Sequence, residues 1–78
     1  MRELIEFIAR SLVDDPTQVR VNQEQRGPKT TLHLWVAQED MGRVIGRKGQ
    51  VASAMRILLN VAAARQGKQA HLDIEEPV

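Results

Sequence analysis

Residues 42–49 read Gly-Arg-Val-Ile-Gly-Arg-Lys-Gly and are the most informative stretch of this 78-residue chain. Gly46 and Gly49 flank two cations, and helical patterns lie on both sides. Glycines permit a tight turn and let a phosphodiester approach the main chain without meeting a Cβ atom. We expect the following helix to direct unpaired amides toward this loop, from Gly49 and Gln50 onward. These features predict a binding site for a sugar–phosphate backbone.

Outward from this loop, hydrophobic residues recur with helical or strand periodicity along the whole chain. The expected elements are a helix over 2–13, strands over 18–22 and 30–37, helices over 39–45 and 50–65, and a strand over 70–75. A Gly-Pro turn within 25–29 joins the first two strands as a hairpin. The order α-β-β-α-α-β predicts one α+β domain over residues 1–78, with a three-stranded sheet and three helices on one face.

An Ile-Gly-x-x-Gly loop between two helices, after two strands and before a third, resembles the K-homology (KH) domain in its bacterial, type II arrangement. More narrowly, the chain is similar to the small, free-standing KH proteins of the KhpA type. KH loops clamp about four single-stranded nucleotides. The resemblance implies a cytoplasmic single-stranded RNA-binding protein of the RNA chaperone type, acting in post-transcriptional regulation linked to cell shape. It also implies a homodimer, or pairing with a second, larger KH-domain protein.

The resemblance also assigns roles to residues, position by position. The residues expected to contact the RNA backbone are Gly46, Arg47, Lys48 and Gly49, assisted by Arg43 and Arg56. The residues expected to form the apolar base groove are Val44, Ile45 and Val51 on its floor, with Leu34 and Val36 on its far wall. Ala52 departs from the large aliphatic residue that many KH domains place there, which makes the expected floor shallower.

The charge distribution agrees with a phosphate-binding surface. The formal net charge is only +1, but residues 42–70 hold six basic and no acidic side chains. Residues 1–41 hold five basic and seven acidic ones, and residues 71–78 hold three acidic ones. A basic segment of this kind is typical of a surface that meets nucleic acid. The alternative is an ordinary solvated face.

The helix expected over 50–65 is apolar around most of its circumference, with only Ser53, Arg56 and Asn60 interrupting it before its end. An arc this wide predicts a second buried surface, centred on Ile57 and Val61, for self-association or a partner. The alternative is that its alanines are simply good helix formers. An interface favours a second functional hypothesis: a protein-interaction subunit whose KH fold mainly mediates dimerisation with an RNA-binding partner.

Several other classes are disfavoured. The chain has no cysteine, and its N-terminal apolar residues are interrupted by charges, so we expect neither secretion nor a membrane span. The loop lacks the spacing of a nucleotide-binding P-loop. His33 and His71 have no carboxylate or cysteine at metal-ligand spacing and are expected to be solvated strand residues. We therefore expect no enzyme activity, cofactor or metal. Trp35 is expected on the sheet face away from the helices, in a packing role.

Overall fold

A computed structural model describes residues 1–76; Pro77 and Val78, the end of the expected 1–78 domain, lie outside the described residues. The helices and strands are α1 (Arg2–Leu12), β1 (Arg20–Arg26), β2 (Lys29–Trp35), α2 (Met41–Ile45), α3 (Gln50–Arg65) and β3 (Gln69–Ile74). Short 3-10 turns cover Pro16–Gln18, Gln38–Asp40 and Arg47–Gly49. The expected element order is confirmed, with boundaries shifted by a few residues at most strand ends.

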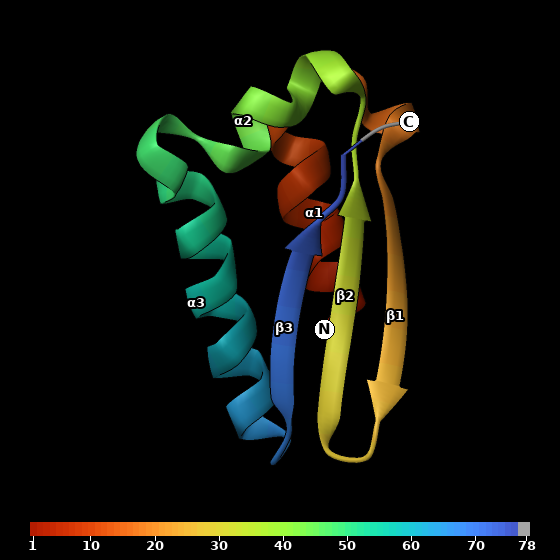
Figure 1. Ribbon diagram of the computed structural model, residues 1–78, viewed down its shortest axis with the longest axis vertical. Coiled ribbons are helices and arrows are strands. Elements are labelled where there is room, and N and C mark those ends of the chain that lie inside the picture. Colours follow the sequence, from red (N-terminus) through yellow and green to blue (C-terminus); the bar gives the residue numbers. More distant parts are fainter. Residues whose placement is uncertain (77–78) are drawn as a thin grey trace.

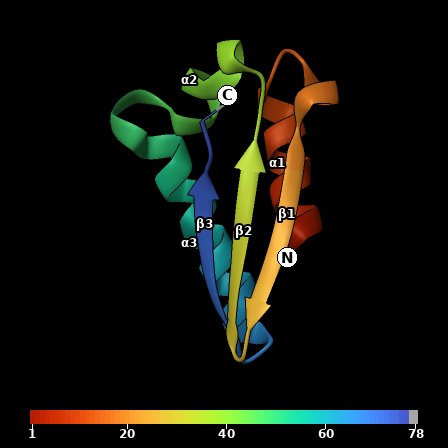
Figure 2. The same ribbon diagram turned by 45° about the vertical axis from the view of Figure 1, so that its right-hand side comes forward.

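The sheet has the strand order β1-β2-β3, with β2 in the centre. β1 pairs antiparallel with β2 as the expected hairpin, while β3 pairs parallel with β2 after the crossover through α2 and α3. All three helices lie on one face of this sheet, and the other face is open (Figures 1 and 2). The α+β class and the type II KH arrangement are therefore confirmed.

The core lies between the sheet and the helices. In the second strand, Leu32, Leu34 and the following Val36 are buried, whereas His33 and Trp35 face the open side of the sheet and are half-buried. The expected alternation is thus confirmed. Five helical residues complete most of the core: Ile5, Ala9, Val44, Met55 and Leu59.

None of the helices within residues 1–76 is long and apolar enough to cross a membrane.

The first helix ends at Leu12, one residue earlier than expected, and Pro16 then opens a 3-10 turn. The carboxylate of Asp15 accepts a hydrogen bond from the Thr17 N–H and so caps that turn. This segment carries the chain from the top of α1 to the start of β1 (Figure 1).

Candidate nucleic-acid interface

The loop between α2 and α3 has a backbone that requires glycine. Gly46 has φ 79° and ψ 172°, Gly49 has φ 75°, and Lys48 between them also has a positive φ of 55°. A Cβ atom at Gly46 would lie only 2.8 Å from the backbone nitrogen of Val51. At Gly49 a Cβ would meet nothing within 4 Å. Gly46 is therefore required both by conformation and by space, and Gly49 by conformation alone.

The amides that this loop leaves free differ from those expected. The N–H of Gly49 donates to the Gly46 carbonyl at 3.1 Å, and the N–H of Gln50 donates to the Arg47 carbonyl. The expectation that these two amides are unpaired is wrong, because the 3-10 turn uses both of them. Within residues 1–76, the amides without an acceptor in this loop are those of Arg47 and Lys48.

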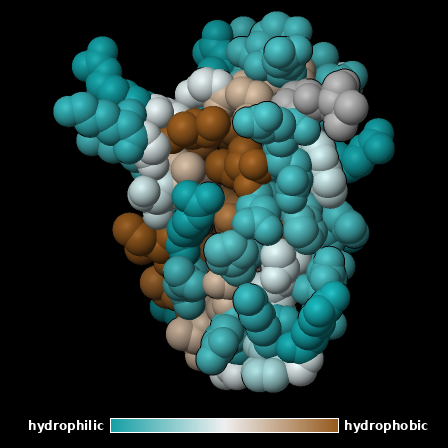
Figure 3. All heavy atoms as spheres, viewed as in Figure 1, coloured by the Kyte–Doolittle hydropathy of each residue, from teal (hydrophilic) through white to brown (hydrophobic). Residues whose placement is uncertain are grey.

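The two loop cations are available as well. Arg47 and Lys48 are exposed, and neither takes part in an ion pair within the described part of the chain. Hydrophilic side chains project from the body where this loop lies (Figure 3). Two amides without an acceptor and two exposed, unpaired cations thus belong to the same short turn, an arrangement that suits a phosphate group.

A buried carboxylate fixes the start of α2 and hence the position of the loop. Asp40 is 2% exposed, and its two carboxylate oxygens accept hydrogen bonds from the N–H groups of Asp14 and Asp15, each at 3.1 Å. The sequence indicated only that its charge suits a helix N-terminus, so this long-range contact was missed. It ties α2 to the segment that follows α1.

Arg43 does not join the free cations of the loop. Its guanidinium contacts Asp14 Oδ2 at 2.9 Å and Asp40 Oδ1 at 3.5 Å. Its charge is therefore compensated by two carboxylates, and in this structure it braces the helix rather than facing a ligand. The side chain of Arg43 is still 53% exposed, and its expected assistance in backbone binding stays a prediction. The sequence separation of 29 between Arg43 and Asp14 concealed the pair.

The apolar surface beside the loop is bounded by β3. Met41 and Ile45 line a shallow depression together with Gln38 and with Glu76, which follows β3. Figure 3 shows apolar residues exposed in this region, between the helices and β3. Ile45 is 36% exposed and Val51 is half-buried, so both can contribute to a groove.

Three of the expected groove residues are instead part of the core. Val44 and Leu34 are 0% exposed and Val36 is 4% exposed. Their side chains face the helix–sheet interior, so they support the surface from below and cannot touch a base in this conformation. β2 is the central strand and β3 is the neighbour of α3. The depression beside the loop is lined by Gln38, which comes shortly after β2, and by Glu76, which comes shortly after β3.

Arg56 lies between α3 and β3, at a second, separate depression. Its Nε donates a hydrogen bond at 3.3 Å to the carbonyl of Leu72, on the free edge of β3. A small depression there is lined by the same two residues with Leu59, Asn60 and Ala70 among others. Arg56 thus places a positive charge on the β3 side of α3, and its expected role in backbone binding stays a prediction.

The outer face of α3 is apolar and uncovered. Ile57 is 65% exposed, Val61 50% and Leu58 49%, and apolar residues stand out along this edge of the helix (Figure 3). The buried residues of the helix lie on its other side and include Met55 and Leu59. The sequence singled out Ile57 and Val61 but not Leu58. It also missed Phe7 on α1, which is 72% exposed.

The open sheet face carries a cluster of histidines and carboxylates. His33 Nδ1 lies 2.8 Å from Glu75 Oε1, and its Nε2 lies 3.5 Å from Glu24 Oε1. The hydrogen bond to Glu75 raises the pKa of the His33 imidazole above its ordinary value, although partial burial opposes the shift. His33 is therefore not the freely solvated residue expected from sequence. Its ring centroid lies 6.0 Å from that of Trp35.

Comparisons with known proteins agree with this architecture. Residues 2–74 match the family described as KhpA/KhpB, KH domain. The chain is 43% identical over 74 residues to the RNA-binding protein KhpA of Clostridium perfringens, which covers 95% of this chain and 99% of that protein. It is 44% identical over 72 residues to the RNA-binding protein KhpA of Borreliella burgdorferi, covering 92% and 88%.

Among solved structures, the chain is similar to part of Aquifex aeolicus Era, with a TM-score of 0.64 and 16% sequence identity. The match covers 94% of this chain and 28% of Era. A structure of Era in complex with nucleotides of 16S ribosomal RNA gives a TM-score of 0.58 at 18% identity. At such low identity these likenesses establish a shared fold.

Proposed function

The chain belongs to the KhpA/KhpB KH-domain family, and from this premise we propose that it binds single-stranded RNA through the loop 46–49. The observation that carries the proposal is the pairing state of this loop. Arg47 and Lys48 combine exposed, unpaired side chains with amides that find no acceptor within residues 1–76. The proteins named RNA-binding protein KhpA, at 42–44% identity, support RNA as the ligand.

The backbone of the RNA would lie along the loop, with its phosphates facing the free amides and the two cations. Gly46 and Gly49 keep Cβ atoms away from the approaching phosphodiester. Arg56, on the β3 side of α3, is placed to contact a further phosphate. KH loops hold about four nucleotides in this way. Arg43 stays an expected contact, although its charge is already paired.

The bases would rest on the shallow apolar surface between the helices and β3. Ile45, Val51 and Met41 supply its partly exposed side chains. Ala52, at 4% exposure, adds nothing to this surface. A small floor without aromatic residues favours weak binding with little base preference, because stacking contributes much of the affinity at aromatic platforms. Transient, sequence-tolerant binding suits an RNA chaperone.

A charge-reversal pair tests the loop directly. The double variant Arg47→Asp/Lys48→Asp should lose binding to a fluorescent single-stranded RNA, and the matched control Arg65→Asp/Lys68→Asp should retain most of it. The control changes the charge by the same amount within the same basic segment, at the last residue of α3 and in the turn that follows it (Figure 1). Equal loss of affinity in both double variants would show that only net charge matters and would remove the clamp.

We propose in addition that the apolar face of α3 joins two KH chains, either two copies of this one or this one and a larger KH-domain protein. Ile57, Leu58 and Val61 together form an exposed apolar stripe on a single helix. Burying them against a second apolar face removes that surface from water. Two linked domains would hold RNA more tightly through effective concentration, which compensates for a weak single site.

Ile57→Asp tests this interface, with Asn60→Asp as its control on the polar side of the same helix. If the chain pairs with itself, the wild type should run as a dimer by light scattering, Ile57→Asp as a monomer, and the control as the wild type. A monomeric wild type that binds no RNA until another chain is added would support the alternative function, that of an interaction subunit. An unchanged mass for Ile57→Asp would exclude this helix face as the contact.

A further inference from the structure

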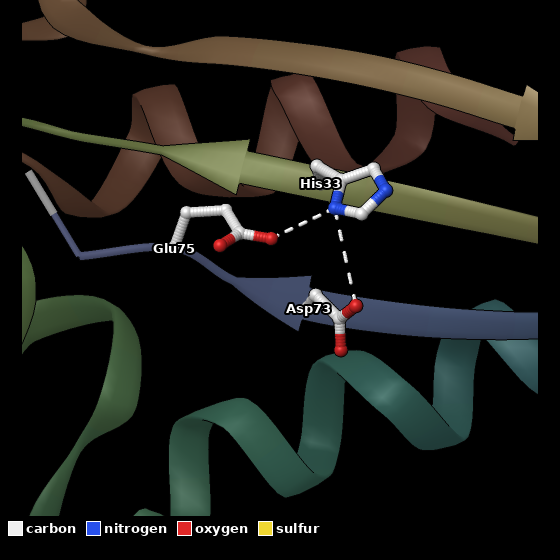
Figure 4. Close-up of side chains that lie close together, drawn as sticks. All are labelled: His33, Asp73 and Glu75. Atoms are coloured by element: carbon white, nitrogen blue, oxygen red, sulfur yellow. Dashed lines mark hydrogen bonds and ion pairs between the residues drawn. The ribbon is translucent and has the colours of Figure 1, made fainter.

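The register of the sheet brings together three side chains that are far apart in sequence. His33 on β2 lies opposite Asp73 on β3. Glu75 follows β3 directly, and its N–H donates to the Leu34 carbonyl at 2.8 Å, which continues the parallel ladder. Residues two apart in an extended chain share a face. The carboxylates of Asp73 and Glu75 therefore both point toward the imidazole of His33 (Figure 4).

We propose that His33, Asp73 and Glu75 bind one divalent transition-metal ion of the zinc class on the open face of the sheet. His33 Nδ1 lies 2.8 Å from Glu75 Oε1 and 3.9 Å from Asp73 Oδ2, and one ligand atom from each residue lies within 4.8 Å of the others. Ligands that each sit about 2.1 Å from zinc are separated from one another by roughly 3–3.6 Å. Small side-chain rotations thus suffice to seat an ion.

The contacts around these three side chains are those that support a metal ligand. A ligating histidine usually directs its second ring nitrogen at a carboxylate or a carbonyl. Here Nε2 of His33 lies 3.5 Å from Glu24 Oε1, which leaves Nδ1 to face the other two carboxylates. Asp73 is oriented in turn by His71, whose Nε2 lies 2.9 Å from Asp73 Oδ1, so that Oδ2 faces His33.

The donor set selects the class of ion. One imidazole nitrogen with two carboxylate oxygens suits Zn²⁺, Co²⁺ or Mn²⁺, whereas Mg²⁺ and Ca²⁺ prefer oxygen ligands alone. The side chains of His33, Asp73 and Glu75 are 21%, 43% and 36% exposed, so an ion can enter from solvent and keep water as its remaining ligands. Binding replaces the Nδ1 hydrogen bond to Glu75, and any proton on Nδ1 leaves to solvent.

The chain contains its own reporter for this site. Trp35 is its only tryptophan, there is no tyrosine, and its ring lies 6.0 Å from that of His33. Paramagnetic Co²⁺ bound to the three residues should quench Trp35 fluorescence in a saturable way, with one ion per chain. Diamagnetic Zn²⁺ should reverse the quenching by displacement, and Mg²⁺ should not. The experiment uses chelator-treated protein in a buffer that does not bind metals.

Three variants, His33→Gln, Asp73→Asn and Glu75→Gln, should each weaken Co²⁺ and Zn²⁺ binding at least tenfold, in line with the loss of a metal contact. The matched control Glu39→Gln removes an exposed carboxylate elsewhere and should bind as the wild type. Unfolding midpoints of the metal-free variants test whether each variant keeps its fold. Non-saturable quenching, or equal affinity in the wild type and His33→Gln, would overturn the proposal.

His71→Gln separates a ligand from a residue that only orients one. It should weaken metal binding less than His33→Gln does, because His71 acts through Asp73. If His71→Gln abolished binding while His33→Gln did not, the assignment of His33 would be overturned. The Arg47→Asp/Lys48→Asp variant should bind Co²⁺ as the wild type does, so the outcome does not depend on RNA binding.

Discussion

The glycine loop and the open sheet face are both polar, and they are built in opposite ways. The loop consists of four consecutive residues whose cations have no acidic partner within the described residues. On the sheet face, His33 and Glu75 are 42 residues apart and meet only through strand pairing. The imidazole of His33 already has three carboxylates around it. A cluster of consecutive residues can therefore be recognised from sequence. A cluster whose members meet only through strand pairing cannot, because its members are far apart along the chain.

Substitutions of Gly46 and Gly49 test how strictly the loop backbone requires glycine at each position. Gly46→Ala should lower the free energy of unfolding by about 2–3 kcal/mol, because its φ/ψ region is nearly restricted to glycine and its Cβ would strike Val51. Gly49→Ala should cost only about 1 kcal/mol, because its left-handed conformation is strained but its surroundings are open. Chemical denaturation measures both. Equal costs would contradict the steric argument.

Asp40 tests whether a contact concealed from sequence also supports the loop. Asp40→Ala should lower the free energy of unfolding by about 2 kcal/mol, because two backbone N–H groups and Arg43 lose a buried carboxylate. Its exposed neighbour serves as the control, and Glu39→Ala should change stability by less than about 0.5 kcal/mol. Thermal or urea unfolding distinguishes the two. A negligible effect of Asp40→Ala would contradict the inference that the Asp40 carboxylate holds α2 in place.

The smallest expected effect concerns the sheet face in metal-free buffer. The hydrogen bond to Glu75 raises the pKa of His33 in the folded state. The charged imidazole therefore stabilises the fold fully below about pH 6.5, the unfolded value, and this contribution is lost as the pH rises through the folded pKa. Denaturation midpoints should fall more over this range for the wild type than for His33→Gln. Parallel profiles would contradict the pairing.

Much of the fold was predictable because its signals are local. The alternation of Leu32 and Leu34, and the glycines around Arg47, each depend on a few adjacent residues. Four features were not predictable, because each depends on which elements become neighbours. Val44 belongs to the core, β3 rather than β2 lies next to α3, Arg43 is paired, and carboxylates surround His33.

Which backbone N–H groups of the loop lack an acceptor could not be predicted from the helix pattern. The helix pattern indicated that Gly49 and Gln50 begin α3 with unpaired N–H groups. The 3-10 turn over Arg47–Gly49 uses both and leaves those of Arg47 and Lys48 free. This turn moves the unpaired amides two residues toward the N-terminus, and the side chains of the loop are the same in either case. The residue types of the loop therefore predicted its cations correctly, whereas the expected hydrogen-bonding pattern predicted the wrong unpaired amides.

The most direct measurement is a titration of fluorescent single-stranded RNA at several salt concentrations, with three proteins side by side. We expect the wild type and His33→Gln to bind alike. We expect Arg47→Asp/Lys48→Asp to lose binding, with a salt slope smaller by roughly 0.7 for each phosphate contact removed. If the loop variant bound RNA as tightly as the wild type while keeping its fold, the assignment of RNA binding to the loop 46–49 would be contradicted.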